Sequence, residues 1–223
     1  MSTTQNIETE ATARGRILDA AIDCFARQGF GASVRTIAAA ADVSPGLITH
    51  HFGSKDALRA ECDGVVLTRY RTLKDDAVDA PAEYMRGLFP DPGTAPVLVV
   101  YMIRALGAGG SAGRRFLDQM IDELRIVMKH SVEAGLVHPS RDEEARLRTF
   151  VTQGMGGMLI EYMNDPGDSP EEFVARILSP THETLLPLLE LYTDGLFATP
   201  DLLDAYLSIR NSTTPTPSPE TED

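Results

Sequence analysis

The sequence predicts an all-α fold in which a bundle of three short helices is followed by a larger helical domain. Apolar residues recur at spacings of three and four along most of the 223-residue chain, which is the periodicity of amphipathic helices. Capping residues, several of them followed by proline, precede these stretches, and no stretch alternates in polarity as a strand does. A hydrophobic content of 43% and a charged content of 24% are typical of a globular chain.

The first predicted helix covers residues 14–28. One face of it is apolar and consists of Ile17, Leu18, Ala21, Ile22 and Phe25. Gly29 is expected to end the helix, because glycine readily adopts the left-handed conformation that follows many helices. Residues 1–13 are mostly polar, and we expect them to form a flexible N-terminal arm.

Three serines mark the starts of the next helices. Ser33, Ser44 and Ser54 are expected to be N-caps, and Pro45 stands at the first helical position, where its missing N–H costs nothing. The predicted helices span 34–41, 45–51 and 55–76. Short helices joined by turns of three or four residues are typical of a helix-turn-helix, whose second helix enters the major groove of DNA.

The rest of the chain is predicted to be helical as well. The expected helices span 81–89, 95–106, 114–134, 142–164, 170–178, 181–197 and 200–209, with breaks rich in Gly and Pro between them. Residues 211–223 contain nine Ser, Thr or Pro residues and predict a disordered tail. The expected organisation is an arm (1–13), a helix-turn-helix domain (14–60), a larger helical domain (61–210) and a tail (211–223).

The charge is distributed unevenly along the chain. The formal net charge is −13, yet residues 1–60 sum to zero and the remainder carries all of it. An acidic body is repelled by a polyanion, so only the N-terminal part can dock on nucleic acid.

A signal peptide is not expected, and the longest apolar run, residues 95–103, is too short to span a membrane, which predicts a cytoplasmic protein without membrane contact. Cys24 and Cys62 predict reduced thiols rather than a disulfide framework.

The stretch "DVSPGLITHHFGSK", residues 42–55, could suggest a metal or catalytic site. His50 and His51 are adjacent on a predicted helix and point about 100° apart, so they do not converge on one ion. The spacing of a phosphate-binding loop is absent, and neither Ser44 nor Ser54 lies in a nucleophile elbow. We therefore expect no metal, no cofactor and no catalytic residues.

The same stretch fits the second helix of a helix-turn-helix. Apolar positions that would lock the two helices together are Val34, Ile37, Ala38, Val43, Ile48 and Phe52. The residues left on the exposed face are Pro45, Gly46, Leu47, Thr49 and His50. Glycine permits close approach to bases, a leucine can contact a thymine methyl, and threonine and histidine can donate to phosphates or base edges.

The segments "RILDAAIDCFARQGF" and "SVRTIAAAADVSPGLITHHFGSKDAL" resemble the N-terminal domain of the tetracycline-repressor (TetR) family of transcription factors. The resemblance covers about residues 14–60. It implies that Ser33, Arg35 and Lys55 contact phosphates and that Ser44, Pro45, Gly46, Leu47, Thr49 and His50 face the groove. Pro45 stands where the family often has Lys or Arg, and Thr49 where a Tyr usually contacts phosphate, so operator preference cannot be transferred from relatives.

The resemblance also implies a homodimer that binds an operator in double-stranded DNA and releases it when a small molecule binds to the domain of residues 61–210. The expected dimer interface lies in 142–164 and 181–197, with Gly154, Gly157, Glu161, Leu185, Leu188, Leu189 and Tyr192 as candidate residues. The glycines allow close helix contact, and "LLPLLELYTDGLF" is apolar nearly all round. A monomeric core containing a glycine-weakened helix stays open as an alternative.

A pocket for a largely apolar effector is expected among stripes of aromatic, methionine and leucine side chains. The candidate residues are Tyr101, Arg104, Met120, Leu124, Met128, Met155, Met158 and Tyr162. Such stripes also fit a plain core, and Arg104 could pair either with a ligand carboxylate or with Glu161.

The sequence thus favours a ligand-responsive repressor that acts as a dimer on a palindromic operator. One alternative is an all-helical binding or enzymatic module whose helix-turn-helix contacts protein. An architectural DNA-binding protein is a further alternative, which the acidic body disfavours. Activation instead of repression stays open.

Overall fold

The computed structural model describes residues 2–83, 93–179 and 185–213, with the backbone alone for residues 2–11 and 213. The chain divides into two compact units, residues 1–180 and 181–223. The first unit contains α1 (Ser2–Gln28), α2 (Val34–Ala40), α3 (Pro45–Phe52), α4 (Lys55–Asp79), α6 (Ala95–Gly107), α7 (Gly110–Glu133), α8 (Glu143–Asn164) and α9 (Pro170–Ile177). The second contains α10 (Leu185–Thr193) and α11 (Asp201–Thr213). No strand occurs in the described ranges, and the predicted all-α class is confirmed.

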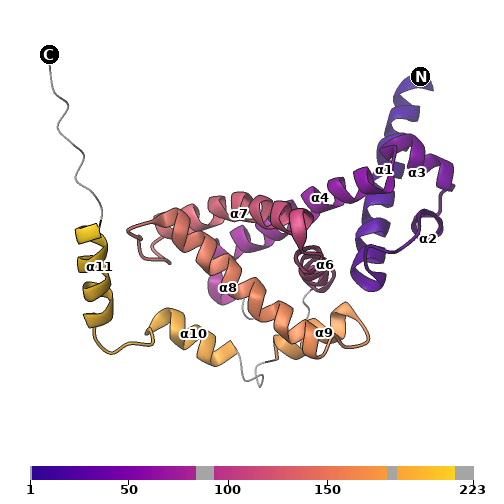
Figure 1. Cartoon of the computed structure of the whole chain (residues 1–223). Helices are drawn as coiled ribbons and strands as arrows, with labels where there is room; N and C mark the ends of the chain where they lie inside the picture. Colours follow the sequence, from indigo (N-terminus) through magenta and orange to yellow (C-terminus); the bar gives the residue numbers. More distant parts are fainter. Residues whose placement is uncertain (1, 84–92, 180–184, 214–223) are drawn as a thin grey trace, which may run out of the picture. The chain divides into compact units, whose positions relative to one another are not determined.

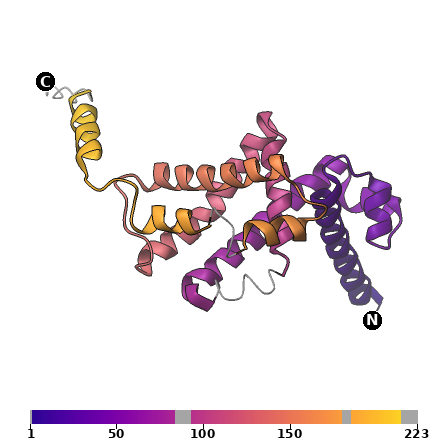
Figure 2. The same cartoon turned by 90° about the horizontal axis from the view of Figure 1, so that it is seen from below.

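The helix-turn-helix bundle forms for the local reasons that its sequence indicates. The side chain of Ser33 accepts a hydrogen bond from the Thr36 N–H at 3.1 Å, and Ser44 and Ser54 cap α3 and α4 in the same way. Ile48 and Phe52 turn inward from α3 and are buried. Both views place α2 and α3 against α1 at one end of the first unit (Figure 1 and Figure 2).

Two helix starts differ from the predicted ones. α1 begins at Ser2 instead of residue 14, so the expected flexible arm is helical backbone from that point; residues 2–13 contain neither Gly nor Pro to interrupt a helix. α7 begins at Gly110 instead of residue 114. Gly113, which the prediction assigned to a break, lies inside the first turn of the helix. A Cβ atom on Gly113 would lie 2.8 Å from the backbone oxygen of Leu106, so this glycine permits a close turn between α6 and α7.

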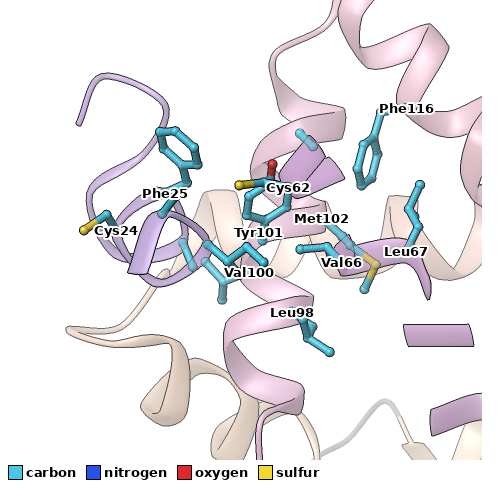
Figure 3. Packing of buried hydrophobic residues seen from close by; sticks show 14 of the residues in the cluster. Cys24, Phe25, Cys62, Val66, Leu67, Leu98, Val100, Tyr101, Met102 and Phe116 are labelled. Atoms are coloured by element: carbon cyan, nitrogen blue, oxygen red, sulfur yellow. The ribbon is translucent and has the colours of Figure 1, made fainter. Parts of the chain in front are cut away.

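α6 occupies the centre of the first unit. Eight of its thirteen residues are buried, so the helix is covered on every side and has no solvent-facing stripe. Figure 3 shows Val100, Tyr101 and Met102 of α6 between Phe25 of α1 and the side chains of α4. α4 leaves the helix-turn-helix end and packs along α7 (Figure 1). α6 therefore touches both α1 and α4, the two long helices of the helix-turn-helix end.

The second unit has little core of its own. α10 contains no buried residue. Large apolar side chains are exposed along α10, along α11 and in the segment between them: Leu186, Leu188, Leu189, Leu191, Tyr192, Leu196, Phe197, Leu202, Leu203, Tyr206 and Ile209. Two predicted helix ends differ in this unit: α10 ends at Thr193 instead of residue 197, and α11 continues to Thr213, so the first three residues of the tail predicted as disordered are helical. Most of the helix predicted at 81–89, the first residues of the one at 181–197 and the rest of the tail predicted at 211–223 lie outside the described residues.

Candidate nucleic-acid interface

The residues expected to contact DNA lie on neighbouring segments. Seven of these nine residues are exposed: Ser33, Arg35, Ser44, Pro45, Gly46, Thr49 and His50. The other two, Leu47 and Lys55, are half-buried. They come from the start of α2, from α3 and from the first residue of α4, and α3 contacts both other helices. The structure therefore brings the predicted residues together around α3.

Two capped helix starts give this surface a favourable electrostatic character. The hydroxyl of Ser44 accepts from the Leu47 N–H at 3.3 Å at the start of α3, and that of Ser54 accepts from the Ala57 N–H at 3.1 Å at the start of α4. The peptide dipoles of a helix place partial positive charge at such an end, which attracts phosphate.

Two cations on this surface, Arg35 and Lys55, have no acidic partner in the described part of the chain. Neither Arg35 nor Lys55 forms an ion pair with any residue that the structure describes. Elsewhere in the bundle, Arg14 pairs with Glu61, and Arg27 pairs with Asp23 at 2.8 Å. Arg35 and Lys55 are thus available to neutralise phosphates, whereas the charges of Arg14 and Arg27 are already balanced by carboxylates.

The face of α3 is divided between packing and exposure. Thr49 and His50 are exposed, and the Thr49 hydroxyl donates only a long hydrogen bond, 3.4 Å, to the backbone oxygen of Pro45. Leu47, expected to face the groove, instead packs partly against the core, so only part of its side chain can reach a base. Of the α3 residues expected to face the groove, Pro45, Gly46, Thr49 and His50 are therefore exposed, and Leu47 is only partly so.

The paired histidines have different surroundings. His50 is exposed, whereas His51 is half-buried, and its Nε2 atom is shielded from solvent without a hydrogen-bond partner. The His51 ring lies edge-on to Phe52, with 6.1 Å between ring centroids. Among the described residues no group of three or more His, Cys, Asp or Glu side chains is arranged to hold a metal ion.

Contacts between α6 and the helix-turn-helix bundle were not foreseen from the sequence. The Tyr101 hydroxyl donates to Oδ1 of Asp63 on α4 at 2.6 Å, and the Phe30 ring packs perpendicular to Tyr101 with centroids 5.3 Å apart. The Arg104 guanidinium donates from Nε to the backbone oxygen of Ala26 at 2.8 Å. Tyr101 and Arg104 were expected to line an effector pocket, and here they bind residues of α4 and α1 at the helix-turn-helix end.

Burial changes the acidity of several groups beside these contacts. It raises the pKa of Asp63 above its usual range, although the Tyr101 hydrogen bond opposes this. Burial also raises the pKa of the Tyr101 hydroxyl, and that of the Cys62 thiol to about 12. Cys24 and Cys62 are both buried and free, and at neutral pH both stay protonated thiols.

Among the described residues, the eight candidate effector-binding residues are distributed between the core, a crevice and a groove. Tyr101 and Met120 are fully buried and Met155 nearly so, while Leu124 and Met158 pack against the core. Arg104 and Tyr162 border a crevice of about 100 Å³ beside the loop of residues 166–170. Met128 lies in a separate groove of about 280 Å³ between α7 and α8, with Val132 and Leu147. A third pocket, of about 360 Å³, lies between α4 and α7.

The candidate dimer residues differ in exposure. Gly157 is exposed and Gly154 half-buried, and a Cβ atom on either would meet nothing within 4 Å. Glu161 forms an ion pair with Arg176 at 3.4 Å and does not pair with Arg104. On α10, Leu185 is half-buried while Leu188, Leu189 and Tyr192 are exposed.

Within the described ranges no helix has both the length and the apolar composition of a membrane span.

Comparison with known proteins places this architecture in a family. Residues 17–62 match the family model "Bacterial regulatory proteins, tetR family", and residues 94–198 match "Tetracyclin repressor-like, C-terminal domain". The HTH-type transcriptional regulatory protein RaaS of Mycobacterium tuberculosis is 37% identical over 201 residues, covering 89% of this chain and 93% of RaaS. The chain belongs to the TetR family. The protein is thus a TetR-family transcriptional regulator with a DNA-binding helix-turn-helix.

Two further relatives delimit the similarity. The HTH-type transcriptional regulator UidR of Escherichia coli K12 is 47% identical over 55 residues, which cover 24% of this TetR-family chain and 28% of UidR. The crystal structure of a TetR-family transcriptional regulator from Rhodococcus sp. aligns with a TM-score of 0.55 at 21% identity, over 75% of this chain and 95% of that one. The latter shows that the fold is shared.

Proposed function

We propose that this TetR-family regulator is a homodimeric repressor that binds a palindromic operator and leaves it when a small, largely apolar effector binds. The observation that carries the DNA-binding part is the exposed face of α3 beside Arg35 and Lys55, two cations that pair with no acidic side chain among the described residues. A dimer bound at a promoter would exclude the transcription machinery. DNA binding also implies a cytoplasmic location.

Each part of the surface has a separate role in the proposal. Phosphate contacts from Ser33, Arg35 and Lys55 set the position of the protein, and contacts from α3 select the sequence. The groove-facing set is Ser44, Pro45, Gly46, Leu47, Thr49 and His50. Because the net charge is −13, most of the molecule repels DNA, and binding is confined to this surface.

Exposed apolar surface supports the dimer. On α8, Phe150, Ile160 and Met163 are exposed, with exposed fractions of 44%, 61% and 75%. α10 adds Leu188, Leu189 and Tyr192. Large apolar side chains at this exposure, on α8 of the first unit and separately on α10 of the second, are typical of surfaces that a second chain covers. Two joined recognition helices would read half-sites about one helical turn apart.

The groove between α7 and α8 supports an apolar effector best. Met128, Val132 and Leu147 line it, and the charged side chains of Arg125 and Glu144 stand at its border. Met side chains adapt to varied ligand shapes. A volume of about 280 Å³ suits a small molecule once neighbouring side chains adjust.

The decisive experiment titrates the purified protein against DNA taken from upstream of its own gene, followed by fluorescence anisotropy. We expect saturable binding to one short inverted repeat, which weakens steeply as salt rises. The double variant R35A/K55A is expected to lose binding, while R148A, which removes only an exposed ion pair with Asp118, should bind as the wild type does. Absence of binding to any such fragment at low salt would contradict the proposal and favour a helix-turn-helix that contacts protein.

A further inference from the structure

The C-terminal end of α1 is capped by a side chain from α6. The last carbonyl groups of a helix lack partners within the helix itself. Here the Nε atom of Arg104 donates to the backbone oxygen of Ala26 at 2.8 Å, and Nη2 donates to that of Arg27 at 3.3 Å. The donor lies 78 residues after Ala26 in the chain. A helix of the larger domain therefore completes the hydrogen bonding of a helix in the DNA-binding end.

The surroundings of Arg104 are shaped to hold its planar group. Gly29 follows α1 with a φ of +80°, and a Cβ atom there would lie 3.1 Å from Nη1 of Arg104. On another side, the guanidinium lies 5.5 Å from the centroid of the Tyr162 ring on α8. Arg104 thus joins three helices, α1, α6 and α8, at a single point.

This contact differs in kind from its neighbours. Arg27 binds Glu171 of α9 through two hydrogen bonds of 2.9 and 2.6 Å, but both partners are long exposed side chains that can follow a movement. Arg104 instead binds backbone atoms, which cannot move without the helix. Because its two donors form a rigid fork aimed at successive carbonyls, a rotation of α1 relative to α6 breaks both hydrogen bonds.

We propose that Arg104 is a positioning residue that fixes the orientation of the helix-turn-helix bundle on α6, and so sets the distance between the two recognition helices of the dimer. This inference rests on the proposed function, because spacing has meaning only for a dimer on a palindrome. The crevice of about 100 Å³ beside the guanidinium gives it room to leave the two carbonyls. A shift of α6 or of Tyr162 would then be passed directly to α1.

The test compares operators that differ only in the spacing of their half-sites. Wild type, R104A, R104K and the control R148A are titrated by anisotropy against the palindrome, against versions with one or two base pairs added or removed at the centre, and against an isolated half-site. In R104A we expect the preference for the correct spacing to fall about tenfold, as for loss of a hydrogen bond from a charged donor, while half-site binding stays within about twofold. R104K keeps the charge but not the fork and should be intermediate, and R148A should match the wild type.

Hydrogen exchange of the full-length protein without DNA supplies a second readout. In R104A the amides of residues 26–32 should exchange faster than in the wild type, while the exchange rates in α3 stay the same. This pattern would indicate that the end of α1 is released locally. A wild-type spacing profile in R104A, or an equal loss on every DNA including the half-site, would overturn the inference. Failure of the proposed function is distinct, because the wild type itself would then prefer no palindrome while exchange in R104A still rises.

Discussion

The helix-turn-helix bundle and the second unit use apolar residues in opposite ways. In the bundle, Ile17, Phe25 and Ile37 are fully buried, and capping serines satisfy the helix starts. In α10 no residue is buried, and Leu189 keeps 47% of its surface exposed. The bundle completes its core within one chain, whereas α10 is apolar without a core. An apolar helix without buried residues is typical of a surface that another chain covers, which agrees with the proposed dimer.

The largest expected effect comes from the core of the bundle. Phe25→Ala should lower the free energy of unfolding by about 3–5 kcal/mol, because the ring is fully buried and a cavity would remain. Chemical denaturation followed by circular dichroism measures this change. A loss below about 1 kcal/mol would mean that the bundle does not depend on its own core, and the contrast with α10 would fail.

The next effect concerns the exposed side chains of α10. Leu189→Asp should raise the dimer dissociation constant about thirtyfold, as expected for a central apolar contact, without lowering the stability of the first unit. Sedimentation at a series of concentrations gives the constant, and thermal melting monitors stability. Glu190→Ala, one residue away on the same helix, is the matched control. An unchanged dimer dissociation constant in L189D would show that α10 does not form the dimer interface.

A smaller effect is expected on the DNA-binding surface. Lys55→Ala should weaken binding to all sequences alike by roughly fivefold and reduce the salt dependence by about one phosphate, since its role is electrostatic. Thr49→Ala should alter the preferred bases instead. Anisotropy titrations on operators with single base changes, at several salt concentrations, distinguish the two. Equal effects of both variants on every sequence would refute the division between phosphate and base contacts.

The smallest effect concerns the surface of the first unit. Nδ1 of His130 on α7 lies 2.9 Å from Oδ1 of Asp75, and Nε2 lies 3.4 Å from Asp79, both on α4. The hydrogen bond with Asp75 raises the pKa of His130, so the folded state binds the proton more tightly than the unfolded state does.

The stability that His130 contributes is therefore complete below the pKa of the unfolded chain, about 6.5, and is lost as pH rises through the higher folded value. The melting temperature of the wild type should exceed that of His130→Gln most at pH 5.5 and least at pH 8.5. A difference that grows with pH would contradict a raised pKa of His130 in the folded protein.

Local features of the chain were predictable because their causes lie within a few residues. Ser33, Ser44 and Ser54 cap the helices that follow them, and Gly29 ends α1, all as expected from residue type. Where the cause was not local, the prediction was incomplete. The start of α7 depends on Gly113 fitting against the backbone of Leu106, a contact between two helices that no residue pattern signals.

The candidate sites divide in the same manner. The residues expected around α3 do lie together, because they belong to one short segment and its flanking helix starts. The residues expected to line one effector pocket come from α6, α7 and α8, and they are distributed between the core, the crevice and the groove. Their grouping depended on how three helices pack, which side-chain type alone does not specify.

The amino-acid pattern alone predicts the helical class, the serine caps and the exposed residues of α3, because periodicity and capping act over three or four residues. The contacts of Tyr101 and Arg104 became visible only once the helices were packed together. Their partners, Asp63 and the backbone of Ala26 and Arg27, lie 38 to 78 residues away in the chain. A backbone carbonyl has no residue identity, so its need for a donor becomes visible only when α6 is packed against α1.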